Sequence, residues 1–232
     1  MEQNVLICGD LHGNWSSLNQ LMQKKLPDII LCCGDFGWWP KLEVSRSVVY
    51  SRKSWKCKGL KIPENTKVYF CDGNHEDHWD LEKCRGDSFD ITELYDRCYY
   101  CPRGSSLVLP DGRRVLFLGG ADSIDKRMRT LGIDWYPEEV INYADVERCM
   151  SLETPIDIVI SHTVPLEWVP DKSREDKTSD PSRKALSIIL EKFSPPLWFS
   201  GHWHRYAEGT YKDTRWKSLD YPGHQGRWWV NL

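Results

Sequence analysis

The 232-residue sequence lacks three features, each of which would assign it to a particular class of protein. No run approaches the roughly 18 consecutive apolar residues of a membrane-spanning helix, so no membrane partner is expected. The N-terminus lacks a basic segment followed by an apolar stretch and a small-residue cleavage site, which predicts a cytoplasmic protein without a signal peptide. Positive charge is not in excess, since 31 Lys and Arg residues face 34 Asp and Glu residues. This balance argues against a broad basic surface that binds extended nucleic acid.

The nine cysteines do not form the pattern of a disulfide-bonded secreted domain. Their number is odd, and several lie inside apolar runs, as Cys32 and Cys71 do. A chain of this length buries roughly 70 to 75% of its unfolded surface without disulfides, and it is expected to form one domain over residues 1–232. We therefore predict small buried side chains in a reducing compartment. The one close pair, Cys98-x-x-Cys101, is interpreted as the bend of a hairpin.

Short apolar runs rich in β-branched residues recur along the chain, each bounded by Gly, Asp or Pro. Such runs are typical of strands that are covered on both faces. The predicted strands are Asn4–Cys8, Asp28–Cys33, Lys67–Cys71, Arg114–Leu118, Ile156–Ser161 and Leu197–Ser200. The helical spacing of apolar residues predicts helices over Trp15–Lys25, Pro137–Leu152 and Ser182–Phe193. Strands that alternate with helices indicate an α/β architecture.

The C-terminal part differs, because three strand-like segments follow one another with no helix between them. They are Tyr206–Tyr211, Arg215–Leu219 and Arg227–Leu232, and we expect them to close the fold as a meander. Residues 170–183 are interpreted as a long solvated loop, with gating of a substrate as the alternative. Several of the 12 tryptophans lie beside polar motifs, where they either fill space between layers or stack on a base or sugar ring.

Most of the predicted strands end in a short polar motif rather than in an ordinary turn. In open α/β sheets, ligands bind at the carboxyl ends of the strands. The Asp-x-His and His-x-His pairs alternate with period two, so an extended backbone would point both partners to one side. Each motif alone has an ordinary explanation as a turn, a cap or a surface histidine, but five in succession favour one shared site. The motifs are Gly9-Asp10-Leu11-His12, Gly34-Asp35, Gly73-Asn74-His75-Glu76, Ser161-His162 and Gly201-His202-Trp203-His204.

The order of these five motifs resembles that of the calcineurin-like metallophosphoesterase superfamily, in its branch of small bacterial and phage enzymes. The resemblance spans residues 9 to 204 and includes, less specifically, the segments Gly119–Ser123 and Trp135–Glu139. It implies an α/β fold of two packed mixed β-sheets flanked by helices, in four layers of the order α-β-β-α.

The resemblance also implies a dinuclear metal site with seven ligands. One ion would be held by Asp10, His12 and His204, the other by Asn74, His162 and His202, with Asp35 bridging both. Such mixed carboxylate, imidazole and amide donors suit borderline divalent ions, with manganese favoured and iron, zinc or nickel as alternatives. A hydroxide that bridges the two ions would attack phosphorus directly. His75 would be catalytic and not a ligand, and it would stabilise the developing charge or protonate the leaving oxygen.

The implied activity is hydrolysis of a small or nucleotide-like phosphoester, either a diester or a monoester. A Ser/Thr protein phosphatase is the alternative enzyme, but such enzymes carry an Asp-Arg pair shortly after the second motif, where this chain has Phe36-Gly37. They also generally lack the last histidine, which is present here as His204. A non-catalytic scaffold would be expected to lose ligands, and none is lost here. The candidates for phosphate binding are Arg127, Arg129 and Arg205, with Arg205 favoured because it follows His204.

Overall fold

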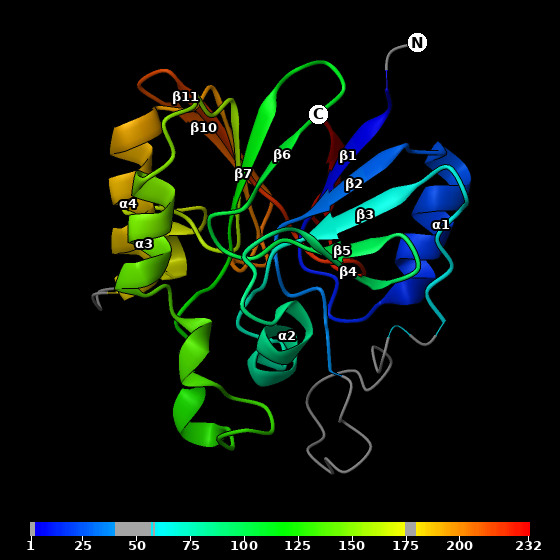
Figure 1. Ribbon diagram of the computed structural model, residues 1–232, viewed down its shortest axis with the longest axis horizontal. Coiled ribbons are helices and arrows are strands. Elements are labelled where there is room, and N and C mark those ends of the chain that lie inside the picture. The colour runs from blue at the N-terminus through cyan, green and yellow to red at the C-terminus, as the bar shows by residue number, and fades with distance from the viewer. Residues whose placement is uncertain (1–2, 40–56, 58, 175–179) are drawn as a thin grey trace.

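The computed structural model describes residues 3–39, 57, 59–174 and 180–232, which form two six-stranded β-sheets packed against each other (Figure 1). Helices lie on the outer face of each sheet, so the layers follow the order α-β-β-α. The fold class predicted from the sequence is therefore confirmed.

Both sheets have the same plan, with four parallel strands in the middle and one antiparallel strand at each edge. The strand orders are β12-β1-β2-β3-β5-β4 and β10-β11-β9-β8-β7-β6. The first sheet contains β1 (Val5–Cys8), β2 (Ile29–Cys32), β3 (Lys67–Phe70), β4 (Thr92–Tyr95), β5 (Cys98–Tyr100) and β12 (Trp229–Asn231). The second contains β6 (Ser106–Val108), β7 (Arg114–Leu118), β8 (Ile158–Ser161), β9 (Leu197–Ser200), β10 (Ala207–Tyr211) and β11 (Thr214–Ser218).

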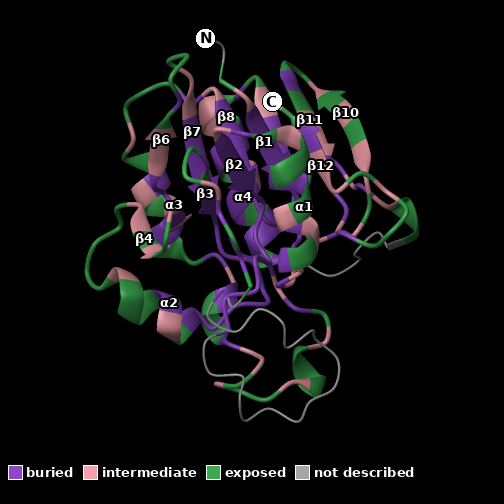
Figure 2. Cartoon of the chain, turned by 90° about the vertical axis from the view of Figure 1, so that its right-hand side faces the viewer, coloured by how far each residue is buried: buried purple, intermediate pink, exposed green. Residues whose placement is uncertain are grey.

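Alternation of side chains along the strands builds three apolar layers. In β1, Ile7 packs between the two sheets together with Ile160 of β8, whereas Leu6 and Cys8 pack on the outer face together with helix α1. A third layer joins the second sheet to α3 and α4. Figure 2 shows the resulting burial of the central strands. All nine cysteines are free, and all but Cys84 are buried, as predicted for small apolar side chains.

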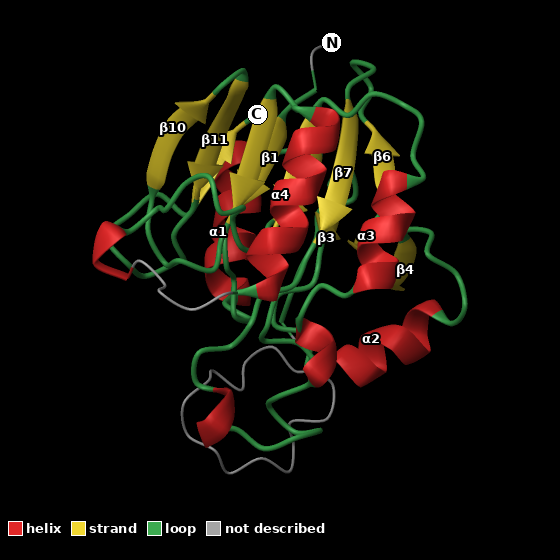
Figure 3. Ribbon diagram, turned by 90° about the vertical axis from the view of Figure 1, so that its left-hand side faces the viewer, coloured by secondary structure: helices red, strands yellow, loops and turns green. Residues whose placement is uncertain are grey.

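The helices begin where polar side chains cap them. α1 (Trp15–Lys25) has the predicted bounds, and Asn14 accepts a hydrogen bond from the backbone of its first turn. α4 (Pro181–Phe193), which confirms the third predicted helix, is capped in the same way by Asp180. Figure 3 shows α3 and α4 together on the outer face of the second sheet. The other helical elements are α2 (His78–Arg85), α3 (Tyr143–Met150), η2 (Lys126–Met128), η3 (Pro137–Glu139) and η4 (Lys172–Arg174).

The predicted helix Pro137–Leu152 is wrong in its first part. Residues 137–139 form a single 3-10 turn, and α3 begins only after Asn142, which forms a capping box with Asp145. The cause lies elsewhere in the chain, because the Arg103 guanidinium donates to the carbonyls of residues 138, 139 and 140. A continuous helix would need these carbonyls for its own hydrogen bonds.

Two further predictions about local connections are also wrong. The C-terminal segments do not form one meander, because β12 leaves the β10–β11 hairpin and pairs antiparallel with β1 in the other sheet, with Val230 opposite Ile7. The bend of the β4–β5 hairpin precedes Cys98, which begins β5, so Cys98-x-x-Cys101 is not the bend. Among the residues that the structure describes, no helix is long and apolar enough to cross a bilayer.

Candidate metal centre

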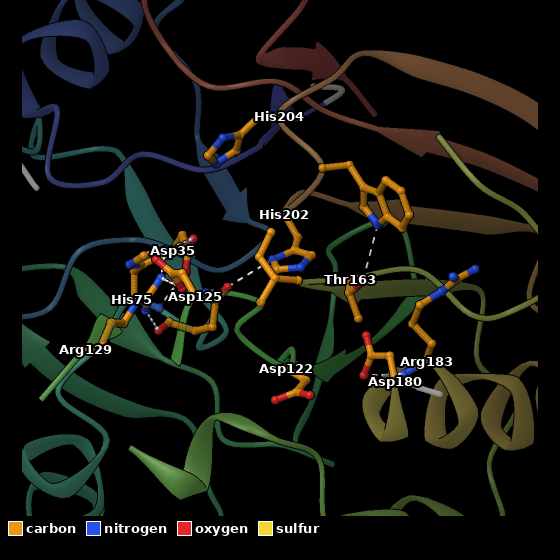
Figure 4. Close-up of a pocket in the computed structure, with 13 residues that line it drawn as sticks. Asp35, His75, Asp122, Asp125, Arg129, Thr163, Asp180, Arg183, His202 and His204 are labelled. Atoms are coloured by element: carbon orange, nitrogen blue, oxygen red, sulfur yellow. Dashed lines mark hydrogen bonds and ion pairs between the residues drawn. The ribbon is translucent and has the colours of Figure 1, made fainter. Parts of the chain in front are cut away.

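The five polar motifs meet at one edge of the molecule. Three of them follow β1, β2 and β3 of the first sheet, and two follow β8 and β9 of the second sheet. β1, β2 and β3 are parallel to one another, as are β8 and β9, so within each sheet their carboxyl ends lie at the same edge. Figure 4 shows side chains from several of these loops around one cavity.

The first group of side chains contains one potential donor atom from each of Asp10, His12, Asp35 and His204, and these atoms lie within 4.8 Å of one another. His204 Nε2 lies 3.1 Å from Asp10 Oδ2 and 3.1 Å from His12 Nε2. His12 Nε2 lies 3.7 Å from Asp35 Oδ2. Two carboxylates and two imidazoles therefore face a common point.

A second group forms around the side-chain oxygen of Asn74. This Oδ1 lies 2.9 Å from His162 Nε2 and 3.0 Å from His202 Nδ1. His162 Nε2 also lies 3.3 Å from Asp35 Oδ1. Asp35 therefore contributes one oxygen to each group. The structure brings together all seven residues that the sequence suggested as ligands.

Hydrogen bonds that involve backbone groups connect the loops of the site to one another. The N–H groups of Leu11 and His12 donate to the Asp35 carbonyl, which ties the first motif to the second. The His202 N–H donates to the Asp10 carboxylate, which ties the fifth motif to the first. His162 Nδ1 lies 2.8 Å from the Cys33 carbonyl, so it donates there and leaves Nε2 to face the site.

The backbone at this edge is not extended, which corrects the period-two expectation. His12, Asp35, His202 and His204 have φ angles of 44°, 43°, 64° and 48°, in the left-handed region. A residue other than glycine is held there at a cost of about 1 kcal/mol. The paired side chains still face one site, but they do so through strained turns rather than through alternation along a strand.

Two buried carboxylates dominate the electrostatics of the site. Asp10 and Asp35 are at most 1% exposed, and their ion-pair partners within the described ranges are histidines. Burial alone would raise the pKa of Asp35, but the imidazoles of His162, His75 and His12 together outweigh it and hold that pKa well below its ordinary value. Burial would lower the pKa of His162, but Asp35, together with Asp10 and the Cys33 carbonyl, raises it to about 10. Buried carboxylates ringed by imidazoles fit a divalent cation, which would replace the imidazolium proton.

A cavity of about 250 Å³ opens beside the two groups. His75 faces it, and the His75 N–H donates to Asp35 Oδ1 at 2.8 Å. Arg129 lies next to His75, with Nη2 2.9 Å from His75 Nε2, and forms a 2.7 Å ion pair with Asp125. The cavity is lined by Asp35, Asn74, His75, Asp122, Ile124, Asp125, Arg129, Thr163, Asp180, Arg183, His202, Trp203 and His204.

The three arginines considered from the sequence lie in different surroundings. Arg129 lines the cavity, whereas Arg127 is exposed on η2. Arg205 is 58% exposed and pairs with Asp171 at 3.4 Å, outside the residues that line the cavity. Arg183, which the sequence analysis did not single out, lines the cavity from α4. In the sequence, only the position of Arg183 in the polar segment 170–183 could have suggested that it lies near the site. Residues 175–179 of that segment lie outside the described residues.

The chain is similar to known proteins in sequence and in fold. The family model of calcineurin-like phosphoesterases matches residues 3–206. A curated relative, a lariat debranching enzyme of Arabidopsis thaliana, is 25% identical over 234 residues, which cover 86% of this chain and 54% of the relative. The chain therefore spans about half the length of this curated relative.

Two solved structures were compared at the level of the fold. GAP50, the anchor in the inner membrane complex of Plasmodium, has a TM-score of 0.51 and 13% identity, with 94% of this chain and 71% of that chain covered. Phosphopantetheinyl hydrolase from Mycobacterium tuberculosis has a TM-score of 0.46 and 15% identity, with 99% and 95% covered. Since the family model matches most of its length, this chain belongs to the calcineurin-like phosphoesterase family.

Proposed function

We propose that this protein is a metal-dependent phosphoesterase, with residues 1–232 forming a single domain, that hydrolyses a small or nucleotide-like phosphoester. The observation that carries the proposal is the convergence of two carboxylates, four imidazoles and one amide beside one cavity. Membership of the family supports a phosphoester as the substrate. The nine free cysteines, eight of them buried, favour a reducing compartment such as the cytoplasm.

The seven side chains divide into two ligand groups that share Asp35. Asp10, His12 and His204 would hold one divalent ion, and Asn74, His162 and His202 would hold the other. Bound there, two ions would supply a hydroxide nucleophile near neutral pH and neutralise charge on the phosphate. The donor types suit manganese best in this proposal, with iron, zinc or nickel as alternatives.

In this proposal, His75 and Arg129 act on the substrate and do not bind an ion. An arginine only donates hydrogen bonds, so His75 Nε2 accepts from Arg129 and the ring carries its proton on Nδ1. Burial lowers the pKa of His75 well below its ordinary value, which agrees with a neutral ring. An approaching phosphate would attract Arg129 and favour protonation of His75, which could then protonate the leaving oxygen.

The cavity favours a small substrate. Its volume of about 250 Å³ is near the lower end for ligand pockets. Asp122, Asp125 and Asp180 line it alongside the arginines, and this acidic rim disfavours a long polyanion. Both monoesters and diesters fit these constraints, and a protein phosphatase remains the alternative enzyme.

The proposal is tested by hydrolysis assays on chelator-stripped protein that is reconstituted separately with Mn, Ni, Zn and Mg. The substrates are bis-p-nitrophenyl phosphate, p-nitrophenyl phosphate, a phosphopeptide and, because of the Arabidopsis relative, a lariat. We expect turnover that a metal restores, and the ratio of diester to monoester rates narrows the substrate. Phosphopeptide turnover far above that of the diester would favour the protein phosphatase. A chain that binds no ion and hydrolyses none of the four would overturn the proposal in favour of a scaffold.

Replacement of Arg129 by alanine should lower kcat/KM by about 10²-fold without changing the bound metal, because a phosphate clamp is lost while both ligand groups remain. Arg129→Lys should recover part of the rate, since it restores the charge but not the guanidinium geometry. The matched control is Arg127→Ala, two residues away on the exposed face of η2, which should stay within about twofold of the parent. Equal losses in the two alanine variants would contradict a specific role for Arg129.

A further inference from the structure

Ser123 and Glu139, from the segments 119–123 and 135–139, are linked to Asn74 through its amide nitrogen. Two histidines face the amide oxygen instead. Asn74 Nδ2 donates to Ser123 Oγ at 2.9 Å, while Asn74 Oδ1 faces His162 and His202. Ser123 Oγ in turn donates to Glu139 Oε2 at 2.8 Å. All three members of this chain of hydrogen bonds are buried: Asn74 is 4% exposed, Ser123 is 2% exposed and Glu139 is fully buried.

Glu139 is itself held from several sides. The Ser123 N–H and the Trp135 indole N–H donate to Oε1 at 2.7 and 3.2 Å. The Arg103 guanidinium binds the Glu139 carbonyl at 3.1 Å. With three donors directed at it, the carboxylate acts only as an acceptor. None of these donors belongs to the seven proposed ligands.

The direction of these hydrogen bonds, from Asn74 through Ser123 to Glu139, follows from which groups carry protons. A carboxylate has none to give, so the single proton of the Ser123 hydroxyl must point to Glu139. The remaining lone pairs of Ser123 Oγ can then only accept, and the end of the Asn74 amide that faces Ser123 must be the NH₂. The oxygen is thereby turned toward the histidines, as a metal ligand requires.

We propose that Glu139, acting through Ser123, is a positioning residue that determines which end of the Asn74 amide faces the metal-binding groups. This inference rests on the proposed function, because it takes Asn74 as a ligand. Reversing the proton pattern should reverse the amide. In Glu139→Gln, the new NH₂ would donate to Ser123 Oγ, the serine proton would point to Asn74, and the amide would present its NH₂ to the ion.

A second substitution should compensate for the reversed hydrogen bonds of Glu139→Gln. In the double variant Asn74→Asp with Glu139→Gln, the glutamine donates to Ser123 Oγ and the serine donates to one oxygen of the new carboxylate. The other oxygen then faces the ion. Every donor and acceptor is satisfied, and the total charge equals that of the parent. In the single variant Asn74→Asp, two carboxylates compete for one serine proton, which should weaken binding.

The test is Mn²⁺ affinity and stoichiometry, measured by calorimetry at pH 8 on the full chain, with no activity readout. This pH lies above the value of about 7 to which burial raises the pKa of Glu139. We expect Glu139→Gln to weaken binding of one of two ions by about 10- to 100-fold, as for other groups that orient metal ligands. The double variant should bind more tightly than either single variant. Glu138→Gln, the same change at the exposed neighbouring residue, should bind as the parent does.

Melting of each variant in chelator separates misfolding from altered affinity. Ser123→Ala, which breaks the chain without reversing it, should weaken binding, and adding Glu139→Gln to it should have no further effect. If Glu139→Gln binds both ions like the parent, or if the double variant binds no more tightly than the tighter of the two single variants, the inference is wrong while the proposed function stands. If the parent itself binds no ion, both are wrong.

Discussion

Asp35→Ala is expected to lower phosphoester hydrolysis by at least about 10²- to 10³-fold and to remove bound metal as well. In the proposed site Asp35 gives one oxygen to each ligand group, so its loss would weaken both, whereas each other proposed ligand belongs to one group. Metal content per chain and turnover with bis-p-nitrophenyl phosphate are the two measurements. Asp111→Ala, which removes a carboxylate from the exposed surface, is the control. A variant that keeps two ions and its turnover would exclude a bridging role for Asp35.

The same pair of measurements separates His75 from the ligands. His75→Ala should keep both ions and lose about 10²- to 10⁴-fold in turnover, because the proposed general acid is removed while the proposed ligands remain. A folded His75→Ala protein without metal would show instead that His75 supports the metal groups.

Arg103→Met is expected to lower the free energy of unfolding by about 3 to 5 kcal/mol, the largest stability effect that we predict. Arg103 is 7% exposed and pairs with Asp72 at 2.6 Å and Asp145 at 3.1 Å. Methionine would leave Asp72 buried without its arginine and would leave Asp145 paired with Arg148 alone. Urea unfolding measures the effect, and Arg113→Met, which removes a partly exposed pair with Asp111, should change it by at most about 1 kcal/mol. A loss that small for Arg103→Met would contradict the prediction.

The pH dependence gives a second check on Arg103. Burial alone would raise the pKa of Asp72, but Arg103, with a smaller contribution from His78, outweighs burial and lowers it below the ordinary value of 3.8. A carboxyl whose pKa is lower in the folded state stabilises the fold above its unfolded pKa and loses that effect as the pH falls through the folded pKa. The difference between the parent and Arg103→Met should therefore be largest near neutral pH and shrink below about pH 4.

The parts of the fold that follow local rules were predictable from the sequence. The buried strands show as apolar runs because both faces are covered, and α1 shows as an apolar stripe after the cap Asn14. The end of the helical turn after Glu139 was not predictable, because Arg103, 36 positions earlier, donates hydrogen bonds to the carbonyls of residues 138 to 140. The pairing of β12 with β1 joins opposite ends of the chain, and no local pattern encodes it.

The candidate site likewise has parts that were predictable from the sequence and parts that were not. The motifs carry their own signal, since each places a ligand type at the end of a strand. Arg129 could be named as a candidate but not chosen over Arg205, because its approach to His75 depends on a loop 54 residues further along the chain. Likewise, the sequence predicts Glu139 only as part of the first turn of a helix. The structure shows instead that its carboxylate accepts a hydrogen bond from Ser123.

The left-handed turns at His12, His202 and His204 have a consequence for the stability of the site. Glycine adopts this conformation without strain, so a change from histidine to glycine there would relax the backbone while it removed a donor. At His12 and His204 the change would also remove an ion-pair partner of a buried carboxylate, which costs stability. The backbone strain at these turns and the charges of Asp10 and Asp35 therefore act in opposite directions on the free energy of unfolding.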